Sequence, residues 1–78
     1  MKIEINGMYK PGWAVSFLED DKPIKFIREA LVSIKPDSLP TILTEQVVID
    51  EDGHPVADGN QIKTKFVVYY PDVFSIEG

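Results

Sequence analysis

The sequence has no cysteine and a single histidine, His54. Disulfides and thiolate metal sites are therefore excluded, and one histidine alone cannot build a zinc site of the cysteine–histidine type. A chain of 78 residues is expected to form one small domain over residues 1–78. A domain of this size buries only about 60% of its unfolded surface, so folding depends on the apolar core or on a core that a partner chain completes.

Long apolar runs and clusters of basic residues are also missing. The longest uncharged stretches fall far short of the roughly 20 residues that a membrane span needs, and the opening MKIEING lacks the apolar segment of an export signal. We therefore expect no membrane partner and a cytoplasmic location, which is the host cytoplasm if the gene belongs to a phage. The net charge is −5 and the basic residues are scattered, which argues against a nucleic-acid partner.

What the sequence does contain is alternation of polar and apolar residues, interrupted at short intervals by glycine and proline. This pattern predicts β-strands separated by turns. Strands are expected over residues 2–5, 13–27 (as a hairpin with a polar turn at 19–23), 41–50, 62–70 and 73–76. We predict an all-β fold, either a small antiparallel barrel or a two-layer sandwich of about five or six strands.

Residues 22–34 are compatible with either a helix or a strand. The apolar positions with helical spacing are Ile24, Ile27, Leu31 and Ile34. Residues 30–34, however, resume the alternation of a strand after a break at Arg28 and Glu29. We favour a long strand bent by a β-bulge at these two residues. The alternative is an α+β fold with a helix over residues 22–34.

The strand that ends at Tyr70 carries apolar residues on both faces. Phe66 and Tyr70 share the face assigned to the core, whereas Val67 and Tyr69 point the opposite way. A small domain with two apolar strand faces needs a second layer, from its own chain or from another. Because Trp and Tyr are common interface anchors, Trp13, Val67 and Tyr69 are candidate interaction residues.

The two clearest strands are joined by an acidic segment, DEDGHPVADGN, which spans residues 50–60 and holds four acids. Its spacing does not meet the glycine and glutamate positions of an EF-hand calcium loop, and a polar hairpin loop uses the same residue types. His54 has no nucleophile elbow, phosphate loop or dinucleotide fingerprint around it. We therefore expect no metal, no cofactor and no catalytic residue. Asp50, Asp52 and Asp58 are candidate interaction residues.

The stretch from Val32 to Asp50, VSIKPDSLPTILTEQVVID, resembles small β-rich proteins encoded by bacteriophages and prophages, and the opening KIEING is similar in style to theirs. The resemblance covers residues 30–50 and the opening residues, and it carries no chemical motif. It therefore transfers no site residues. It implies a virion component, an accessory factor or an acidic inhibitor of host machinery.

These observations predict a non-enzymatic interaction or assembly module, phage-encoded if the resemblance holds. It would act through β-edge and aromatic contacts with a protein partner or with further copies of itself. One alternative is an acidic inhibitor that occupies a basic site on a host protein, which requires acids in several turns to share one end of the molecule. Those acids are Glu19, Asp20, Asp21, Asp50, Glu51, Asp52 and Asp58.

A further alternative is a small nucleic-acid-binding barrel. Such a barrel binds a strand by stacking bases on aromatic side chains beside a basic groove. It would need several lysines to converge beside Trp13 or Tyr69. Those lysines are Lys10, Lys25, Lys63 and Lys65.

Overall fold

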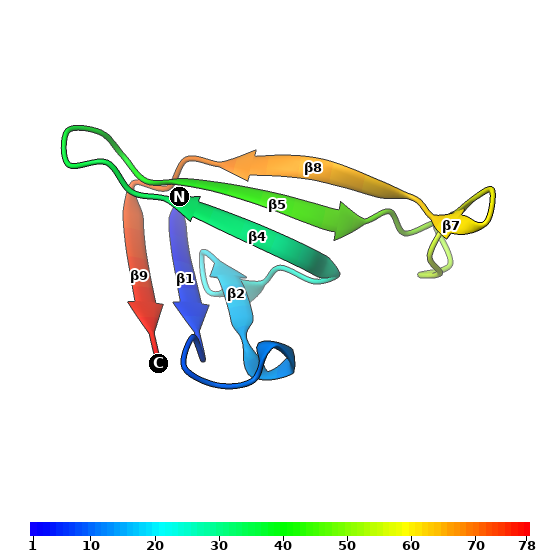
Figure 1. Ribbon diagram of the computed structural model, residues 1–78, viewed down its shortest axis with the longest axis horizontal. Helices are drawn as coiled ribbons and strands as arrows, with labels where there is room; N and C mark the ends of the chain where they lie inside the picture. The colour runs from blue at the N-terminus through cyan, green and yellow to red at the C-terminus, as the bar shows by residue number, and fades with distance from the viewer.

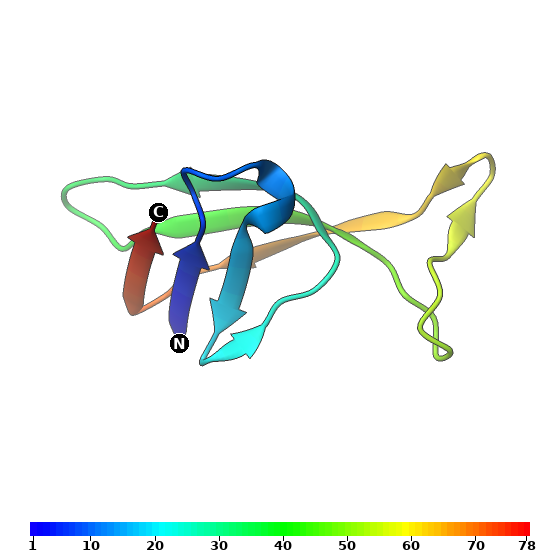
Figure 2. The ribbon, with the colours of Figure 1, turned by 90° about the horizontal axis from the view of Figure 1, so that it is seen from below.

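A computed structural model describes the chain from Met1 to Gly78, apart from the side chain of Trp13. The chain forms two β-sheets that cross one another, and an arm extends from one of them (Figures 1 and 2). The prediction of a small all-β fold is confirmed. Of the two predicted architectures, the structure is the sandwich, because the sheets do not close into a barrel. Over the described residues, no helix is long and apolar enough to cross a membrane.

Nine strands and one short 3-10 helix make up the fold. In chain order they are β1 (Lys2–Asn6), the 3-10 helix η1 (Gly12–Ala14), β2 (Ser16–Glu19), β3 (Lys22–Pro23), β4 (Ile27–Ser33), β5 (Thr41–Val47), β6 (Ala57–Asp58), β7 (Gln61–Ile62), β8 (Thr64–Tyr69) and β9 (Val73–Glu77). The first sheet has the order β3-β2-β1-β9, the second has the order β4-β5-β8, and β6 and β7 form a small hairpin. Within the first sheet β1 pairs antiparallel with β2 and parallel with β9, while the second sheet is antiparallel throughout.

The core lies between the two sheets and is small. Alternation along β1 turns Ile3 and Ile5 inward, and alternation along β5 turns Ile42 to meet them. Among the described side chains these three form the fully buried apolar cluster. Partly buried neighbours surround them: Val15, Phe17, Ile24, Val32, Tyr69 and Phe74. Much of the remaining apolar surface of this chain therefore faces solvent.

The ambiguous segment is a strand. β4 pairs with β5 along its length, and the register shifts between Ile27 and Glu29, which leaves Arg28 as the extra residue of a β-bulge. The predicted bulge is confirmed, and the alternative of a helix over residues 22–34 is wrong. Pairing with β5 determines the outcome, since the β-branched residues of both strands favour a ladder over a short isolated helix. Just before β4, Phe26 has a positive φ of 65°, and its carbonyl accepts a hydrogen bond from the N–H of Val47 at 2.9 Å.

The hairpin predicted over residues 13–27 forms, but it is shorter: it starts after η1, its turn is narrower than the predicted 19–23, and its second strand ends at Pro23. β2 and β3 form a hairpin whose two connecting residues, Asp20 and Asp21, both have positive φ (49° and 68°). This backbone shape matches the twist of a two-residue hairpin, and Asp tolerates it better than most residues. The N–H of Lys2 donates to Asp20 Oδ1 at 2.8 Å, which fixes the turn against β1.

An arm spans the residues between β5 and β8. It projects beyond the sheets and ends in the β6–β7 hairpin (Figures 1 and 2). Three backbone hydrogen bonds hold its base: Val48 N–H to Lys63 O at 2.9 Å, Val56 N–H to Val48 O at 3.0 Å, and Lys63 N–H to Val56 O at 2.8 Å. The segment predicted as a polar loop is therefore an ordered extension of the second sheet.

Candidate functional site

The second sheet covers the core with one face and leaves the other face open. Val32, Ile42 and Tyr69 lie side by side in the register and belong to the core. Because neighbouring residues of a strand point to opposite faces, the next row, Leu31–Leu43–Val68, points outward. We call this surface the outer face; it consists of Glu29, Leu31, Leu43, Glu45, Phe66 and Val68.

The centre of the outer face is apolar and accessible. Phe66 is 71% exposed and Leu31 is 59% exposed. Leu31, Leu43 and Phe66 line a groove of about 80 Å³ together with two carboxylates, Glu29 and Glu45. Contiguous exposed apolar surface on a small domain marks a place where another molecule binds. The outer face is therefore the first candidate site.

β8 alternates as predicted, but the assignment of its two sides is wrong. Phe66 and Tyr70, predicted to face the core, are exposed at 71% and 65%. Val67 and Tyr69, named as candidate interaction residues, sit on the side that faces the first sheet. Whether Val67 and Tyr69 take part in binding stays a prediction, but they lie on the opposite side of the sheet from the exposed patch.

A buried polar network explains why β8 turns this way. Gln46, on the inner side of β5, donates from Nε2 to the Tyr69 hydroxyl at 2.9 Å and to Thr44 Oγ1 at 3.0 Å. The Thr44 hydroxyl donates in turn to the carbonyl oxygen of Val67 at 2.9 Å. Buried polar groups must be paired, and of the aromatic residues of β8 only a tyrosine can offer an oxygen to Gln46. Phe66 is consequently left outside.

The two ends of the outer face differ in chemistry. One end carries Glu29 and Glu45, and the Thr64 hydroxyl donates to Glu45 Oε2 at 2.8 Å. Beyond the apolar row, the other end carries hydroxyl groups and one ammonium group. Four residues of that end line a common hollow: Ser33, Lys35, Thr41 and Tyr70. Two carboxylates thus lie at one end of the outer face and an ammonium group lies at the other.

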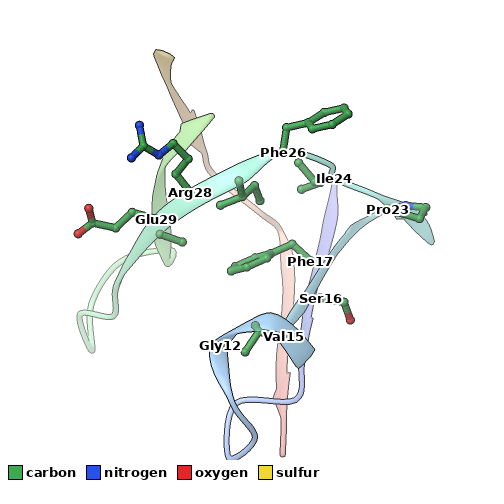
Figure 3. Close-up of a pocket in the computed structure, with 11 residues that line it drawn as sticks. Gly12, Val15, Ser16, Phe17, Pro23, Ile24, Phe26, Arg28 and Glu29 are labelled. Atoms are coloured by element: carbon green, nitrogen blue, oxygen red, sulfur yellow. The ribbon is translucent and has the colours of Figure 1, made fainter. Parts of the chain in front are cut away.

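A cavity of about 410 Å³ opens between the two sheets, beside β2 and β4 (Figure 3). The ring of Phe17 points toward this space, whereas Ser16, Phe26, Arg28 and Glu29 point away from it. The residues around it are Gly12, Val15, Ser16, Phe17, Pro23, Ile24, Phe26, Ile27, Arg28, Glu29 and Ala30. Among these described residues no acid, base or nucleophile converges on the cavity, and its exposed lining is polar and apolar in similar measure.

Asp50, Asp52 and His54 lie together on the arm, with potential ligand atoms within 4.8 Å of one another. All three are exposed, and Asp50 Oδ1 accepts the backbone N–H groups of Asp52 and His54, each at 2.9 Å. This is a turn in which an aspartate binds the backbone two and four residues on. Asp50 therefore already has a role in shaping the chain. Asp58, the third predicted acid, lies in a separate turn of the same arm, at β6.

The acidic turns are divided between two places. The turn between β2 and β3 lies beside the first sheet, where Lys2 Nζ is 3.6 Å from Asp21. The turns of the arm lie out beyond the second sheet (Figure 2). The acids that the inhibitor alternative requires at one end are therefore divided between the β2–β3 turn and the arm.

The aromatic residues of the nucleic-acid alternative are not assembled as that alternative requires. Tyr69 packs against the core and its hydroxyl is bound to Gln46, so its ring is not a free stacking surface. Trp13 lies in η1, and its side chain is outside the described part of the structure. The prediction that Trp13 takes part in an interaction stays a prediction.

Two amino groups with raised pKa lie on the first sheet. The Met1 ammonium group donates a hydrogen bond to Asp72 at 3.0 Å, and this bond and the carboxylate charge raise the pKa of the amine above its ordinary value of 8.0. A hydrogen bond to Glu4 and the charge of Asp21 raise the pKa of Lys2. These contacts connect β1 to its neighbours and lie away from the outer face.

No protein-family model matches the chain, and no curated protein and no solved structure matches it. The residues and their geometry are therefore the basis for a functional assignment.

Proposed function

We propose that this protein is a non-enzymatic interaction or assembly module that binds a protein partner through the outer face. The observation that carries the proposal is the exposure of Phe66 and Leu31 beside Leu43 and Val68, on a domain whose core has three fully buried apolar residues among its described side chains. The chain thus places some of its largest apolar groups where its own fold cannot cover them.

The energetics support binding at this surface. Complete burial of a large apolar side chain is favourable by roughly 1.5–3 kcal/mol, because its surface is removed from water. Phe66 and Leu31 keep more than half of their surface exposed in the free chain, so a partner can recover much of that amount. Aromatic residues at the centre of a patch are also the usual anchors of protein interfaces.

The remaining surfaces fit this role better than a chemical one. Among the described residues no acid, base or nucleophile converges on the cavity between the sheets, and Asp50 on the arm is engaged with its own backbone. The resemblance of residues 30–50 to small phage proteins implies an assembly role and an inhibitor role alike, so it does not select between them.

Site-specific photo-crosslinking tests the proposal directly. A benzophenone amino acid replaces Phe66 in one variant and Tyr9 in a matched control, because Tyr9 is an aromatic residue that is 92% exposed and lies off the outer face. A third variant carries the probe at Ile62, on the arm. The three proteins are illuminated in cells in which the gene is naturally expressed.

We expect a discrete cross-linked product from position 66 and much less from position 9. Equal labelling at positions 66 and 9 would refute binding at the outer face. A cross-linked product from position 62 alone would indicate that the binding site is on the acidic arm and would favour the inhibitor alternative.

A further inference from the structure

We infer that the molecule that covers the outer face is a second copy of this chain, stacked face to face with its strands running antiparallel to those of the first. The inference rests on the proposed function and adds the identity and orientation of the partner. It is carried by the order of chemical groups along the three strands.

The register arranges the outer face in successive rows. The first row holds Glu29, Glu45 and Phe66, and the second holds Leu31, Leu43 and Val68. Alternation beyond the second row brings Ser33 and Thr41, and they line one hollow with Tyr70, just after β8, and Lys35, two residues after β4. From one end to the other the surface therefore passes from carboxylates, through an apolar row, to hydroxyl groups and an ammonium group.

A two-fold axis can relate two stacked sheets in two simple ways. An axis parallel to the strands places the acidic end of one copy on the acidic end of the other, so four carboxylates would gather at one end and Glu45 would face its own equivalent. An axis across the strands reverses the second copy and sets Glu29 and Glu45 against the hydroxyl groups of Ser33 and Thr41, with Lys35 alongside. Like charges in a partly desolvated contact are costly, so the charges select the second arrangement.

The apolar groups fit the same arrangement. When the axis crosses the second row, Leu31, Leu43 and Val68 meet their own equivalents at the centre. Phe66 of each copy then lies over Tyr70 of the other, and aromatic pairs of this kind add to the stabilisation from burial. A surface that complements itself under a two-fold operation is what a dimer interface requires.

The size of the surface sets the expected strength. Three strands about 4.8 Å apart and seven residues long at about 3.3 Å per residue cover roughly 330 Å² in projection, and side-chain relief raises the accessible area to about 500 Å². The pair would bury about 1,000 Å² in total, which is the lower end for a specific interface. We therefore expect a reversible dimer in the micromolar range.

Sedimentation equilibrium on the purified full chain, across a wide range of concentration, tests the inference. We expect a monomer–dimer equilibrium that Leu31→Ser shifts toward monomer by about thirtyfold. Val73→Ser is the matched control, because Val73 is a comparably exposed apolar strand residue on β9 of the other sheet, and it should leave the equilibrium unchanged. A wild-type chain that is monomeric throughout would overturn the inference.

Charge exchange tests the orientation. Glu29→Lys alone and Lys35→Glu alone should each weaken the dimer by about tenfold, since each places like charges together across the interface. The double variant Glu29→Lys, Lys35→Glu should return to within about threefold of the wild type. A double variant whose loss of dimer affinity equals the combined losses of the two single variants would overturn the antiparallel stack. A dimer whose affinity is the same in all three variants would also overturn it and would indicate pairing through the free edge of β8.

The failure of this inference is distinguishable from the failure of the proposed function. A purified chain that stays monomeric, combined with a cross-link from position 66 to a different protein in cells, removes the second copy as the partner and leaves the interaction role standing. A purified chain that stays monomeric and gives no cross-link from position 66 would refute both the second copy as the partner and the interaction role of the outer face.

Discussion

Two neighbouring residues of β5 give a direct test of which side of the second sheet holds the core. Ile42 is 1% exposed and packs between the sheets, whereas Leu43 belongs to the outer face. Truncating each to alanine removes a similar number of carbon atoms from adjacent positions of one strand. The two variants therefore differ mainly in the environment that loses those atoms.

The expected costs follow from burial. Ile42→Ala removes three fully buried carbon atoms, worth about 0.8 kcal/mol each, and leaves a cavity, so the free energy of unfolding should fall by about 3–4 kcal/mol. Leu43→Ala in the monomer should cost about 1 kcal/mol, because the side chain is covered by its own chain only in part. A domain of this length has a total stability of about 4–12 kcal/mol, so Ile42→Ala removes a large share of it.

Urea unfolding followed by far-ultraviolet circular dichroism measures both variants against the wild type, at a concentration low enough for the monomer to predominate. The midpoint for Ile42→Ala should fall far below that for Leu43→Ala, with similar slopes. Equal losses for the two variants at low concentration would show that the outer face is covered within the monomer, and that the assignment of the two faces is wrong.

Three further predictions concern the backbone and the first sheet. Gly7→Ala should lower the free energy of unfolding by more than about 2 kcal/mol, because φ is +86° and a Cβ would lie 2.6 Å from the carbonyl oxygen of Ala14. The control Gly53→Ala, at φ +82° in open space, should cost about 1 kcal/mol, and equal urea midpoints for the two variants would contradict the close approach at residue 7. The pKa of the Met1 amine, measured by NMR titration, should lie above 8.0 and return toward that value in Asp72→Asn. Because the pKa is higher in the folded state than in the unfolded chain, the stabilisation from the Met1–Asp72 contact is present below pH 8 and is lost as pH rises through the folded-state pKa. Phe26→Gly should keep or raise stability by about 1 kcal/mol, because glycine adopts a φ of +65° without strain and the phenyl ring is half exposed; a loss above 2 kcal/mol would show that the ring is needed for packing.

Several parts of the fold could be predicted because local chemistry determines them. The alternation of Ile3 and Ile5 defines β1, and two adjacent aspartates define the turn between β2 and β3. The break in alternation at Arg28 marks the bulge, since a strand that must keep its apolar side inward has to absorb one extra residue there.

Other parts depend on contacts between distant residues. The parallel pairing of β1 with β9 brings the two ends of the chain together, and an alternating pattern does not specify which strand lies beside it. The alternation of β8 points to the wrong side, because the exposed set with Phe66 and Val68 is more apolar in sequence than the inward set, which includes Lys65. Tyr69 is turned inward by Gln46, a residue 23 positions earlier, and that hydrogen bond is visible only in three dimensions.

The same strand joins the core to the proposed interface. β5 is the central strand of its sheet; its inner side carries Ile42 and the network of Thr44 and Gln46, and its outer side carries Leu43 and Glu45. A partner on the outer face binds the folded sheet and not the unfolded chain, so binding must also stabilise the core by mass action. A chain with so few fully buried residues gains more from this coupling than a large domain would. The exposed Phe66 and the small core are therefore two consequences of one arrangement, in which one side of the second sheet covers the core and the other side is open in the free chain.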